Sequence, residues 1–349
     1  MPEKSGVLNV ILLFLVLFVL KSCQAIFLPF FVALFLWVLI YILSSNYSKF
    51  FVERLGCPQC FDKISRVFAI MTIAGVVYFI VVGIKSNIND VVEVFNSSGY
   101  SQGFNDMMAK LQKFFHIETK ITFSTLVSDI DIPKAINSLV QGFASLLSMS
   151  FMVVVYLLFI LLEEKSISKK FPLLFSTEKK EKDARKMLEK IYSKIEVYMS
   201  VKLFTSFLTG VLGYAIMRWV NLDFAVFWAI LMFLFNFIPT VGSVVASVFP
   251  IVYAMLQFNG NIASFLVVSI GILLVQVIIG NIVDPRVMGR RLNLSPLVLI
   301  LSLVIWGSIW GVVGMFLSVP IMIILTIVLL QLPSTKRYAI LLTKDGETF

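Results

Sequence analysis

Apolar stretches of membrane-spanning length recur along most of the chain. A helix needs about 20 predominantly apolar residues to cross the hydrocarbon core of a bilayer. Most of the stretches reach or approach that length, and short polar segments separate them. The pattern therefore predicts an all-α fold, that of a polytopic helical membrane protein with about eight apolar segments. These segments lie near residues 7–20, 26–43, 67–84, 143–162, 203–219, 224–257, 262–280 and 297–332.

Two of the segments are too long for one untilted span and contain helix-breaking residues in the middle. In residues 224–257 the break falls at Pro239 and Gly242, and Asn236 and Thr240 place polar atoms beside it. The last apolar segment repeats this plan with a group of small residues. We expect each segment to form a re-entrant or broken hairpin. The small residues of the last segment are Gly307, Ser308, Gly311 and Gly314.

The two broken segments occupy corresponding places in a repeated pattern. Each follows a simple apolar span, at 203–219 and at 262–280. With Pro250 aligned to Pro320, the stretch GSVVASVFPI resembles GVVGMFLSVPI weakly. The charge distribution starts the first pair of segments inside the cell and the second pair outside. The sequence thus predicts an inverted repeat of a span followed by a broken hairpin.

Inverted repeats with broken helices are typical of secondary transporters, which bind their ligand where such helices meet. A helix that ends inside the membrane leaves backbone N–H and C=O groups unpaired, and a polar ligand can bind these groups. In a second interpretation, Gly and Pro merely permit close helix packing, as in the pattern Gly307-xxx-Gly311. Both interpretations stay open at this point.

Two polar segments interrupt the apolar pattern. One contains five Lys and six Asp or Glu and has apolar side chains at helical spacing, so we expect amphipathic helices on the outer membrane surface. The other has a charged and an apolar helical face, which indicates a cytoplasmic amphipathic helix. The predicted regions are a three-helix membrane region at 1–84, the outer insert at 85–142, a transmembrane helix at 143–162, the cytoplasmic insert at 163–202, an inverted-repeat transport region at 203–332 and a cytoplasmic tail at 333–349.

The charged residues, 14% of the chain, support this topology. With a cytoplasmic N-terminus and two hairpins that return, the cytoplasmic segments hold 22 of the 29 Lys and Arg residues. This bias follows the positive-inside rule, so the net charge of +9 requires no nucleic acid as a partner. We expect both termini in the cytoplasm and the lipid bilayer as the surrounding partner.

Motifs for catalysis or metal binding are weak in this sequence. Cys57 and Cys60 form a CxxC, which is either half of a metal or redox site or two reduced thiols beside Pro58. The single histidine, His116, falls on the other side of the membrane, and no HExxH, GxSxG or Walker-type sequence occurs. The sequence therefore predicts neither an enzyme nor a cofactor nor a metal site.

Polar residues near membrane depth are uncharged, namely Asn236, Gln276 and Asn281. The ionisable residues, Lys202 and Asp284 among them, lie at the predicted ends of spans. Proton- or sodium-driven carriers generally keep an ionisable residue within the membrane. The distribution therefore favours an uncharged solute.

The stretch NIVDPRVMGRRLNLSP at 281–296 joins a simple span to the second broken segment on the cytoplasmic side. Asp284 is the only acid between Asp223 and Asp345, and it lies close to Arg286 in the sequence. Two interpretations stay open. The stretch is either a positive-inside anchor whose acid offsets the arginines, or a gate in which Asp284 pairs with an arginine and separates from it during transport.

The Pro, Gly and Asn positions around both broken segments resemble those of the autoinducer-2 exporter family, the PerM-like bacterial permeases. The match covers residues 236–330. The resemblance implies a bacterial inner-membrane protein that moves small polar molecules such as the autoinducer-2 quorum signal, and some relatives are described as sodium/proton antiporters. It also implies a homo-oligomer such as a pentamer. The matching residues are Pro239, Gly242, Pro250, Asn281, Pro285, Gly289, Pro296, Gly307, Gly311, Gly314 and Pro320.

Together these observations predict a secondary transporter that exports a small polar organic molecule by alternating access at two broken hairpins. A sodium/proton antiporter and a non-transporting envelope scaffold are the alternatives. The residues expected to bind substrate or to gate its path are Asn236, Pro239, Thr240, Gly242, Ser243, Gln276, Asn281, Asp284, Arg286, Gly307, Ser308, Gly311 and Gly314.

Overall fold

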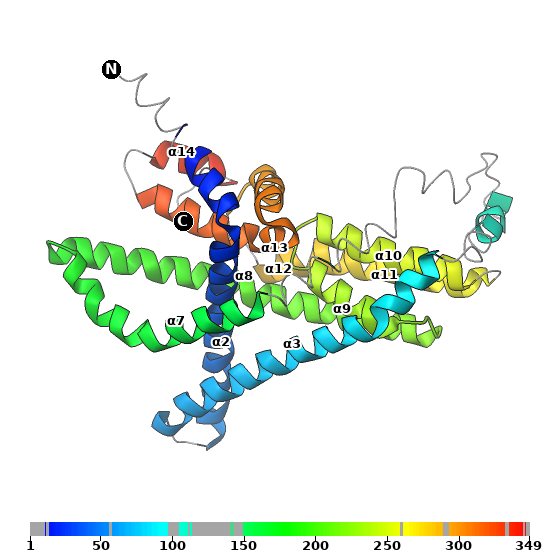
Figure 1. The fold of residues 1–349 in the computed structure, drawn as a ribbon, viewed down its shortest axis with the longest axis horizontal. Coiled ribbons are helices and arrows are strands. Elements are labelled where there is room, and N and C mark those ends of the chain that lie inside the picture. Colours follow the sequence, from blue (N-terminus) through cyan, green and yellow to red (C-terminus); the bar gives the residue numbers. More distant parts are fainter. Residues whose placement is uncertain are drawn as a thin grey trace. The chain divides into compact units, whose positions relative to one another are not determined.

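Helices form nearly all of the regular structure in the computed structural model of the chain (Figure 1). The structure describes residues 11, 14–55, 58–96, 105–110, 112–113, 141, 149–258, 261–288, 293–331, 335–344 and 346. The main helices are α2 (Gln24–Leu55), α3 (Pro58–Asn96), α7 (Ser150–Lys170), α8 (Glu178–Trp219), α9 (Ala225–Phe235), α10 (Val241–Gln257), α11 (Ile262–Ile278), α12 (Asp284–Met288), α13 (Pro296–Gln331) and α14 (Lys336–Leu342). A 3-10 turn, η1, covers Phe171–Leu174, and a π-helical turn, η2, covers Ile279–Val283.

Five helices in the described part of the chain are long and apolar enough to cross a membrane. Two further apolar helices, α9 and α10, have only 11 and 17 residues, because the first broken segment is divided between them. These lengths confirm the prediction of a polytopic helical membrane protein. The five candidate spans are Gln24–Phe50, Lys63–Val94, Glu178–Trp219, Ile262–Met288 and Pro296–Gln331.

The chain divides into two compact units. Unit 1 comprises Met1–Met71, Gly142–Tyr198 and Arg290–Phe349, and unit 2 comprises Thr72–Gln141 and Met199–Gly289. Helices α3 and α8 each continue from one unit into the other. The first broken segment therefore belongs to unit 2 and the second to unit 1. The regions expected from the sequence remain predictions.

Helix α8 extends over 42 residues without interruption. The sequence predicted an amphipathic insert followed by a separate span. The structure joins them because the segment has no Pro and its glycines, Gly210 and Gly213, lie in the apolar half. On the polar half, Arg185 donates to the Glu181 carboxylate one turn earlier at 2.8 Å.

Unit 1 is organised around α2, which packs against α7 and α13. Leu28 of α2 forms a buried apolar cluster with Ile309, Trp310 and Leu317 of α13. The Trp310 indole N–H also donates to the carbonyl of Leu20 at 3.1 Å. Burial of this apolar surface, together with the indole hydrogen bond, holds the middle of α13 against α2 and the residues just before it.

The C-terminal region folds back onto the start of α13. Leu294 and Thr343 form an isolated antiparallel bridge, and the Ser295 N–H donates to the Leu342 carbonyl at 3.0 Å. Helix α14 also contacts α13. The described part of the predicted tail, 333–349, is therefore packed on the rest of unit 1.

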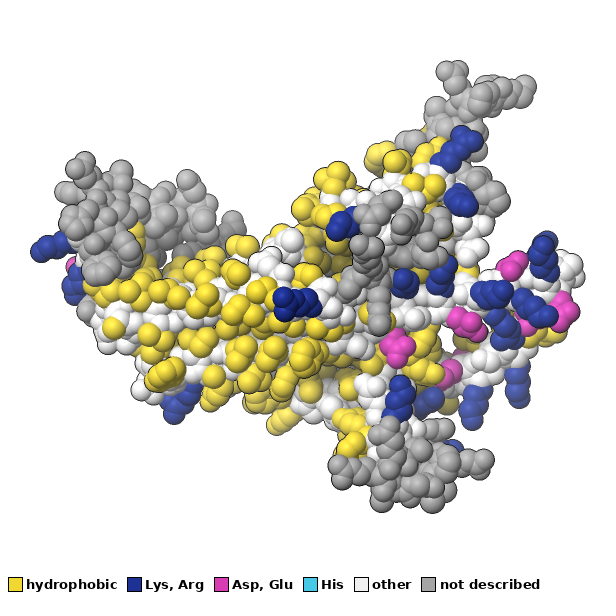
Figure 2. Space-filling view, turned by 180° about the vertical axis from the view of Figure 1, so that it is seen from behind, with side chains coloured by type: hydrophobic (Ala, Val, Ile, Leu, Met, Phe, Trp, Pro, Cys, Tyr) yellow, Lys and Arg dark blue, Asp and Glu magenta, His cyan; other side chains and the backbone are white. Residues whose placement is uncertain are grey.

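Hydrophobic side chains cover a broad part of the visible face of unit 2 (Figure 2). Phe204 and Phe207 of α8 and Leu273 and Leu274 of α11 are among the large apolar side chains that are exposed. Charged side chains gather instead over the end of α7 and the start of α8 (Figure 2). An apolar surface of this extent suits contact with lipid tails.

Candidate functional site

The first break is a five-residue turn, 236–240, between α9 and α10. The Ile238 N–H donates to the Phe235 carbonyl at 2.8 Å, and the Gly242 N–H donates to the Ile238 carbonyl at 3.2 Å. Thr240 adopts a φ of 58°, which is disfavoured for a β-branched residue. Backbone hydrogen bonds therefore hold a locally strained turn at the end of α9.

Both broken segments reverse direction at the break. In the first, the Tyr253 ring of α10 lies 5.4 Å from the Trp228 ring of α9. In the second, the Ser302 hydroxyl donates to the Ser318 carbonyl at 3.2 Å. Both residues belong to α13, on either side of its break. A straight helix would separate residues sixteen positions apart by about 24 Å. The prediction of two broken hairpins is confirmed, and their re-entry into a membrane remains a prediction.

The second break lies at Trp310 and Gly311, where the backbone leaves the helical region. Gly311 has φ 64° and ψ −146°, a conformation that residues with a side chain rarely adopt. A Cβ added there would meet nothing within 4 Å. The requirement for glycine at this position is therefore conformational rather than steric.

At each break, one glycine lies against a backbone carbonyl of the opposite arm. A Cβ on Gly242 would lie 1.8 Å from the Phe235 carbonyl oxygen, and a Cβ on Gly314 would lie 1.9 Å from that of Trp306. In both cases the added Cβ would also lie 3.0 Å from the Cβ of the residue four positions earlier. The two breaks are thus built in the same way. Their geometry matches Gly242 with Gly314, whereas alignment of Pro250 with Pro320 places Gly242 opposite Val312.

A polar stripe runs along the unit 2 part of α8. Lys202, Thr205, Ser206 and Thr209 occupy positions i, i+3, i+4 and i+7 and therefore share one helical face. All four are buried, while Phe204 on another face is exposed. The Thr209 hydroxyl donates to the Thr205 carbonyl at 2.8 Å, and the Thr205 hydroxyl has no hydrogen-bond partner within the described chain.

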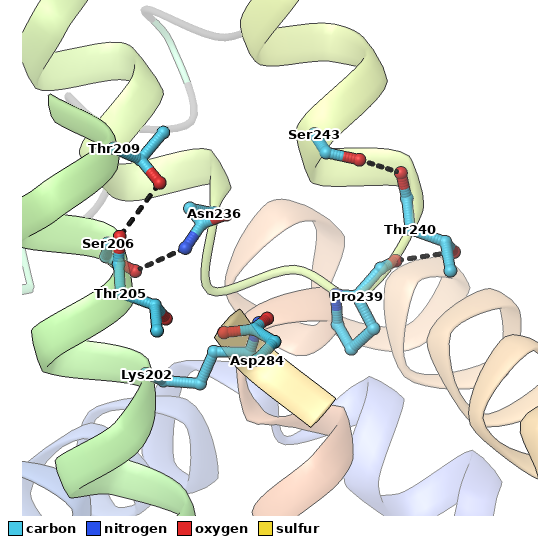
Figure 3. A network of polar contacts seen from close by, with 9 residues as sticks. All are labelled: Lys202, Thr205, Ser206, Thr209, Asn236, Pro239, Thr240, Ser243 and Asp284. Atoms are coloured by element: carbon cyan, nitrogen blue, oxygen red, sulfur yellow. Dashed lines mark hydrogen bonds and ion pairs between the residues drawn. The ribbon is translucent and has the colours of Figure 1, made fainter. Parts of the chain in front are cut away.

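The first break contacts this polar stripe through Asn236 (Figure 3). The Asn236 amide nitrogen donates to the Ser206 hydroxyl at 3.1 Å, and both side chains are buried. Gly210 allows α9 to approach α8 closely, since an added Cβ would lie 3.2 Å from the Ala229 carbonyl oxygen. The polar end of α9 is therefore anchored to the polar stripe.

Asp284 reaches the same stripe from the start of α12 and pairs with Lys202 (Figure 3). The Lys202 ammonium donates to Asp284 Oδ2 at 2.6 Å, and the two side chains are 9% and 15% exposed. The other oxygen, Oδ1, is buried without a partner among the described residues. The sequence suggested that Asp284 pairs with an arginine, and for Arg286 the structure shows that it does not. Arg286 is exposed, and residues two apart on a helix do not face each other. Arg290 and Arg291 lie outside the described residues.

The remaining predicted residues are dispersed. Gln276 is buried on α11, and neither of its amide atoms has a partner in the described structure. Asn281 is exposed in η2. The Ser243 and Ser308 hydroxyls each donate to a carbonyl three residues earlier at 2.8 Å. The structure brings together in unit 2 Asn236, Pro239, Thr240, Gly242, Ser243 and Asp284, whereas Gly307, Ser308, Gly311 and Gly314 lie in unit 1.

The sequence interpretation missed the α8 stripe. Lys202 was assigned to the boundary between the insert and the span, so the polar residues after it were not considered together. The available signal is the helical spacing of one Lys, two Thr and one Ser in KLFTSFLT, inside an otherwise apolar segment. Polar residues at that spacing predict one polar helical face.

A helical membrane protein with two broken hairpins and buried polar side chains at a break has the features of a secondary transporter. Comparison with known proteins places the chain among transporters. Residues 8–334 match the AI-2E family of transporters, and the chain belongs to this family. The resemblance first seen around the two breaks is confirmed and extends over nearly the whole chain.

Several relatives align with most or part of the chain. It is 32% identical over 343 residues to a Haemophilus influenzae protein named "Putative transport protein", covering 94% of this chain and 93% of that one. It is 30% identical over 339 residues to the AI-2 transport protein TqsA of Escherichia coli, covering 95% and 93%. A stretch of 145 residues is 40% identical to the Escherichia coli "Putative transport protein YhhT", covering 42% and 41%.

Proposed function

We propose that this protein is a secondary transporter that exports a small uncharged polar molecule of the autoinducer-2 type across the bacterial inner membrane. The observation that carries the proposal is the pair of equivalent glycine contacts at Gly242 and Gly314. Membership of the AI-2E family and the name of the relative TqsA support the substrate class. The inner-membrane location, cytoplasmic termini and homo-oligomeric assembly expected from the sequence belong to the same proposal.

The breaks provide hydrogen-bonding groups that a continuous helix lacks. The last carbonyls of α9 and the first N–H groups of α10 have no full set of partners within their own helices. Beside them lie the Thr205 hydroxyl and the Asn236–Ser206 pair. Hydroxyl and amide groups both donate and accept hydrogen bonds, so they can bind the hydroxyl groups of a solute that carries no charge.

In the proposed mechanism, the two hairpins open alternately to the two sides of the membrane. The glycine contacts keep the arms of each hairpin close together, so each hairpin moves as one body. A solute bound beside the break is then exposed first to one side and then to the other.

A flux measurement tests the proposal. Purified protein is reconstituted into proteoliposomes, and movement of labelled autoinducer-2 is followed in wild type, Gly242→Leu and Gly75→Leu. Gly75 is the matched control, because it lies in α3 and an added Cβ meets nothing within 4 Å. We expect flux in wild type and in Gly75→Leu, and a loss of at least about tenfold in Gly242→Leu. Equal flux in the two variants contradicts the site assignment.

One observation favours the second candidate function, a sodium/proton antiporter. The Lys202–Asp284 pair is an ionisable group of the kind that cation-coupled carriers use. Sodium-driven proton movement in the same proteoliposomes, without any autoinducer-2 flux, is the result that selects this function. Absence of flux of the signal and of both ions favours the envelope scaffold.

A further inference from the structure

Lys202 and Asp284 form an ion pair between positions 82 residues apart, with side chains only 9% and 15% exposed. The pair between Arg66 and Glu164 in unit 1 is a useful contrast, because its side chains are 41% and 25% exposed and its atoms lie 3.0 Å apart. Removing two charges from water costs about as much as, or more than, their attraction returns. The burial of Lys202 and Asp284 is therefore poorly explained by stability alone.

The Asp284 carboxylate is only half satisfied by its surroundings. Oδ2 accepts from Lys202, while Oδ1 is buried and has no hydrogen-bond partner in the described structure. One turn along α8, the Thr205 hydroxyl is also buried without a partner. Proton binding to the carboxylate converts one of its oxygens into a donor, which the present arrangement lacks.

The helices between α8 and α12 add no charge near the pair, and the described charged residues of α3 in unit 2 are Lys85, Asp90 and Glu93. The chain contains no Asp, Glu, Lys or Arg between Asp223 and Asp284, so α9, α10, α11 and η2 contribute no charge to its surroundings. Arg286 on α12 itself is exposed. In the described part of unit 2, Asp284 forms its ion pair with Lys202 alone. The unit 2 part of α8 and α10 contain three other described ionisable groups, Tyr214, Arg218 and Tyr253. Tyr214 and Arg218 follow Lys202 by twelve or more residues, and Tyr253 follows the first break by more than twelve.

We propose that the Lys202–Asp284 pair is a proton-binding site that couples solute export to proton entry, an inference that rests on the proposed transport function. A proton from outside binds the Asp284 carboxylate to give a neutral carboxyl group. This ends the ion pair and frees the Lys202 ammonium, so that α12 and α8 no longer attract each other through charge. Release of the proton to the cytoplasm restores the carboxylate and the pair. One proton is taken up and one is released, and no covalent bond within the protein changes.

A proton fits this site better than a metal cation does. The ammonium at 2.6 Å already occupies the position beside the carboxylate and repels a second cation. The described residues contain no group of three or more His, Cys, Asp and Glu side chains that could hold a metal ion. Sodium coupling is therefore an outcome that the experiment must distinguish.

The test compares transport with and without a proton gradient in the same proteoliposomes. Steady-state accumulation of labelled autoinducer-2 is measured with a pH difference of one unit and with none. For one proton per solute, the ratio of the two approaches about tenfold in wild type. We expect Asp284→Asn to reduce this ratio to about one. Glu164→Gln, which removes the acid of the partly exposed pair, is the control and should keep the wild-type ratio.

A double variant protects the test against misfolding. Asp284→Asn alone leaves the Lys202 charge buried and unpaired, which destabilises the fold. Lys202→Gln combined with Asp284→Asn removes both charges and should also give a ratio of about one. A wild-type ratio in the double variant, or a wild-type protein that responds to a sodium gradient and not to pH, overturns the proposal.

A spectroscopic measurement separates failure of this inference from failure of the transport proposal. Infrared difference spectra of purified protein across an acid titration report the C=O stretch of a newly protonated carboxylic acid. The band at the protonation of Asp284 should be present in wild type and in Glu164→Gln, and absent in both Asp284 variants. If the band is present but autoinducer-2 flux is absent, the proposed substrate is wrong and the proton site stands. A band that persists in the Asp284 variants overturns the proton site, whatever the flux.

Discussion

The substitution Gly242→Ala places one methyl group where the two arms of the first hairpin touch. The added carbon would lie 1.8 Å from the Phe235 carbonyl oxygen and 2.8 Å from its carbon. Ordinary contacts between a carbon and a carbonyl oxygen begin at about 3.3 Å, so the arms must separate by about 1.5 Å. The obstacle is backbone, which cannot rotate away as a flexible side chain can.

The expected loss of stability follows from two opposing effects. Overpacking of this kind costs about 3 kcal/mol, the upper end of the usual range, because rigid backbone must move. Replacing a helical glycine by alanine returns about 1 kcal/mol through helix propensity. Gly75→Ala in α3 gains the same propensity and meets no atom within 4 Å. The free energies of unfolding of the two variants should therefore differ by about 3 kcal/mol.

Thermal unfolding in one detergent, followed by intrinsic tryptophan fluorescence, measures this difference. For 349 residues the entropy of unfolding is about 0.7 kcal/mol/K, so each kcal/mol shifts the midpoint by about 1.4 °C. The midpoint of Gly242→Ala should therefore lie about 4 °C below that of Gly75→Ala. Gly75→Ala should unfold at or slightly above the wild-type temperature. Equal midpoints for the two variants refute the close crossing of the arms at Gly242.

The same assay serves two further predictions. Gly314→Ala should lower the midpoint as much as Gly242→Ala does. Gly307→Ala should lower it less, because an added Cβ at Gly307 meets only the flexible Met315 side chain. Equal losses for Gly314→Ala and Gly307→Ala would contradict the steric reasoning. Ser206→Ala removes the acceptor of the buried Asn236 amide and should cost about 1–3 kcal/mol, and an unchanged midpoint would show that the amide has another partner.

The local features of the fold were predictable because they depend on nearby residues. Length and hydrophobicity predict the helices, and Pro239 and Gly242 predict where the first hairpin breaks. Alignment of Pro250 with Pro320 places Gly242 opposite Val312, because a comparison of letters does not take contacts into account. The structural counterpart is Gly314, because what the two glycines share is contact with a carbonyl of the opposite arm.

The ion pair was not predictable in the same way. Lys202 and Asp284 lie 82 residues apart, so only the tertiary structure of unit 2 brings them together. The sequence suggested a nearer partner, Arg286, because it lies close along the chain. Helical geometry turns that residue away from Asp284. Charge counting alone therefore placed both members of the pair at the ends of spans and did not show that they meet.

Accessibility of the two breaks from both sides of the membrane tests the alternating mechanism most directly. Single cysteines replace the exposed Thr240, Ser308 and, as a control in the predicted cytoplasmic insert, Ser176, in a protein without its native cysteines. A membrane-impermeant maleimide is then applied to right-side-out and inside-out vesicles. We predict labelling of Thr240→Cys and Ser308→Cys from both sides, slowed by autoinducer-2, and labelling of Ser176→Cys from the cytoplasmic side alone. Labelling of both break positions from only one side, with no effect of the solute, would contradict transport through the two broken hairpins.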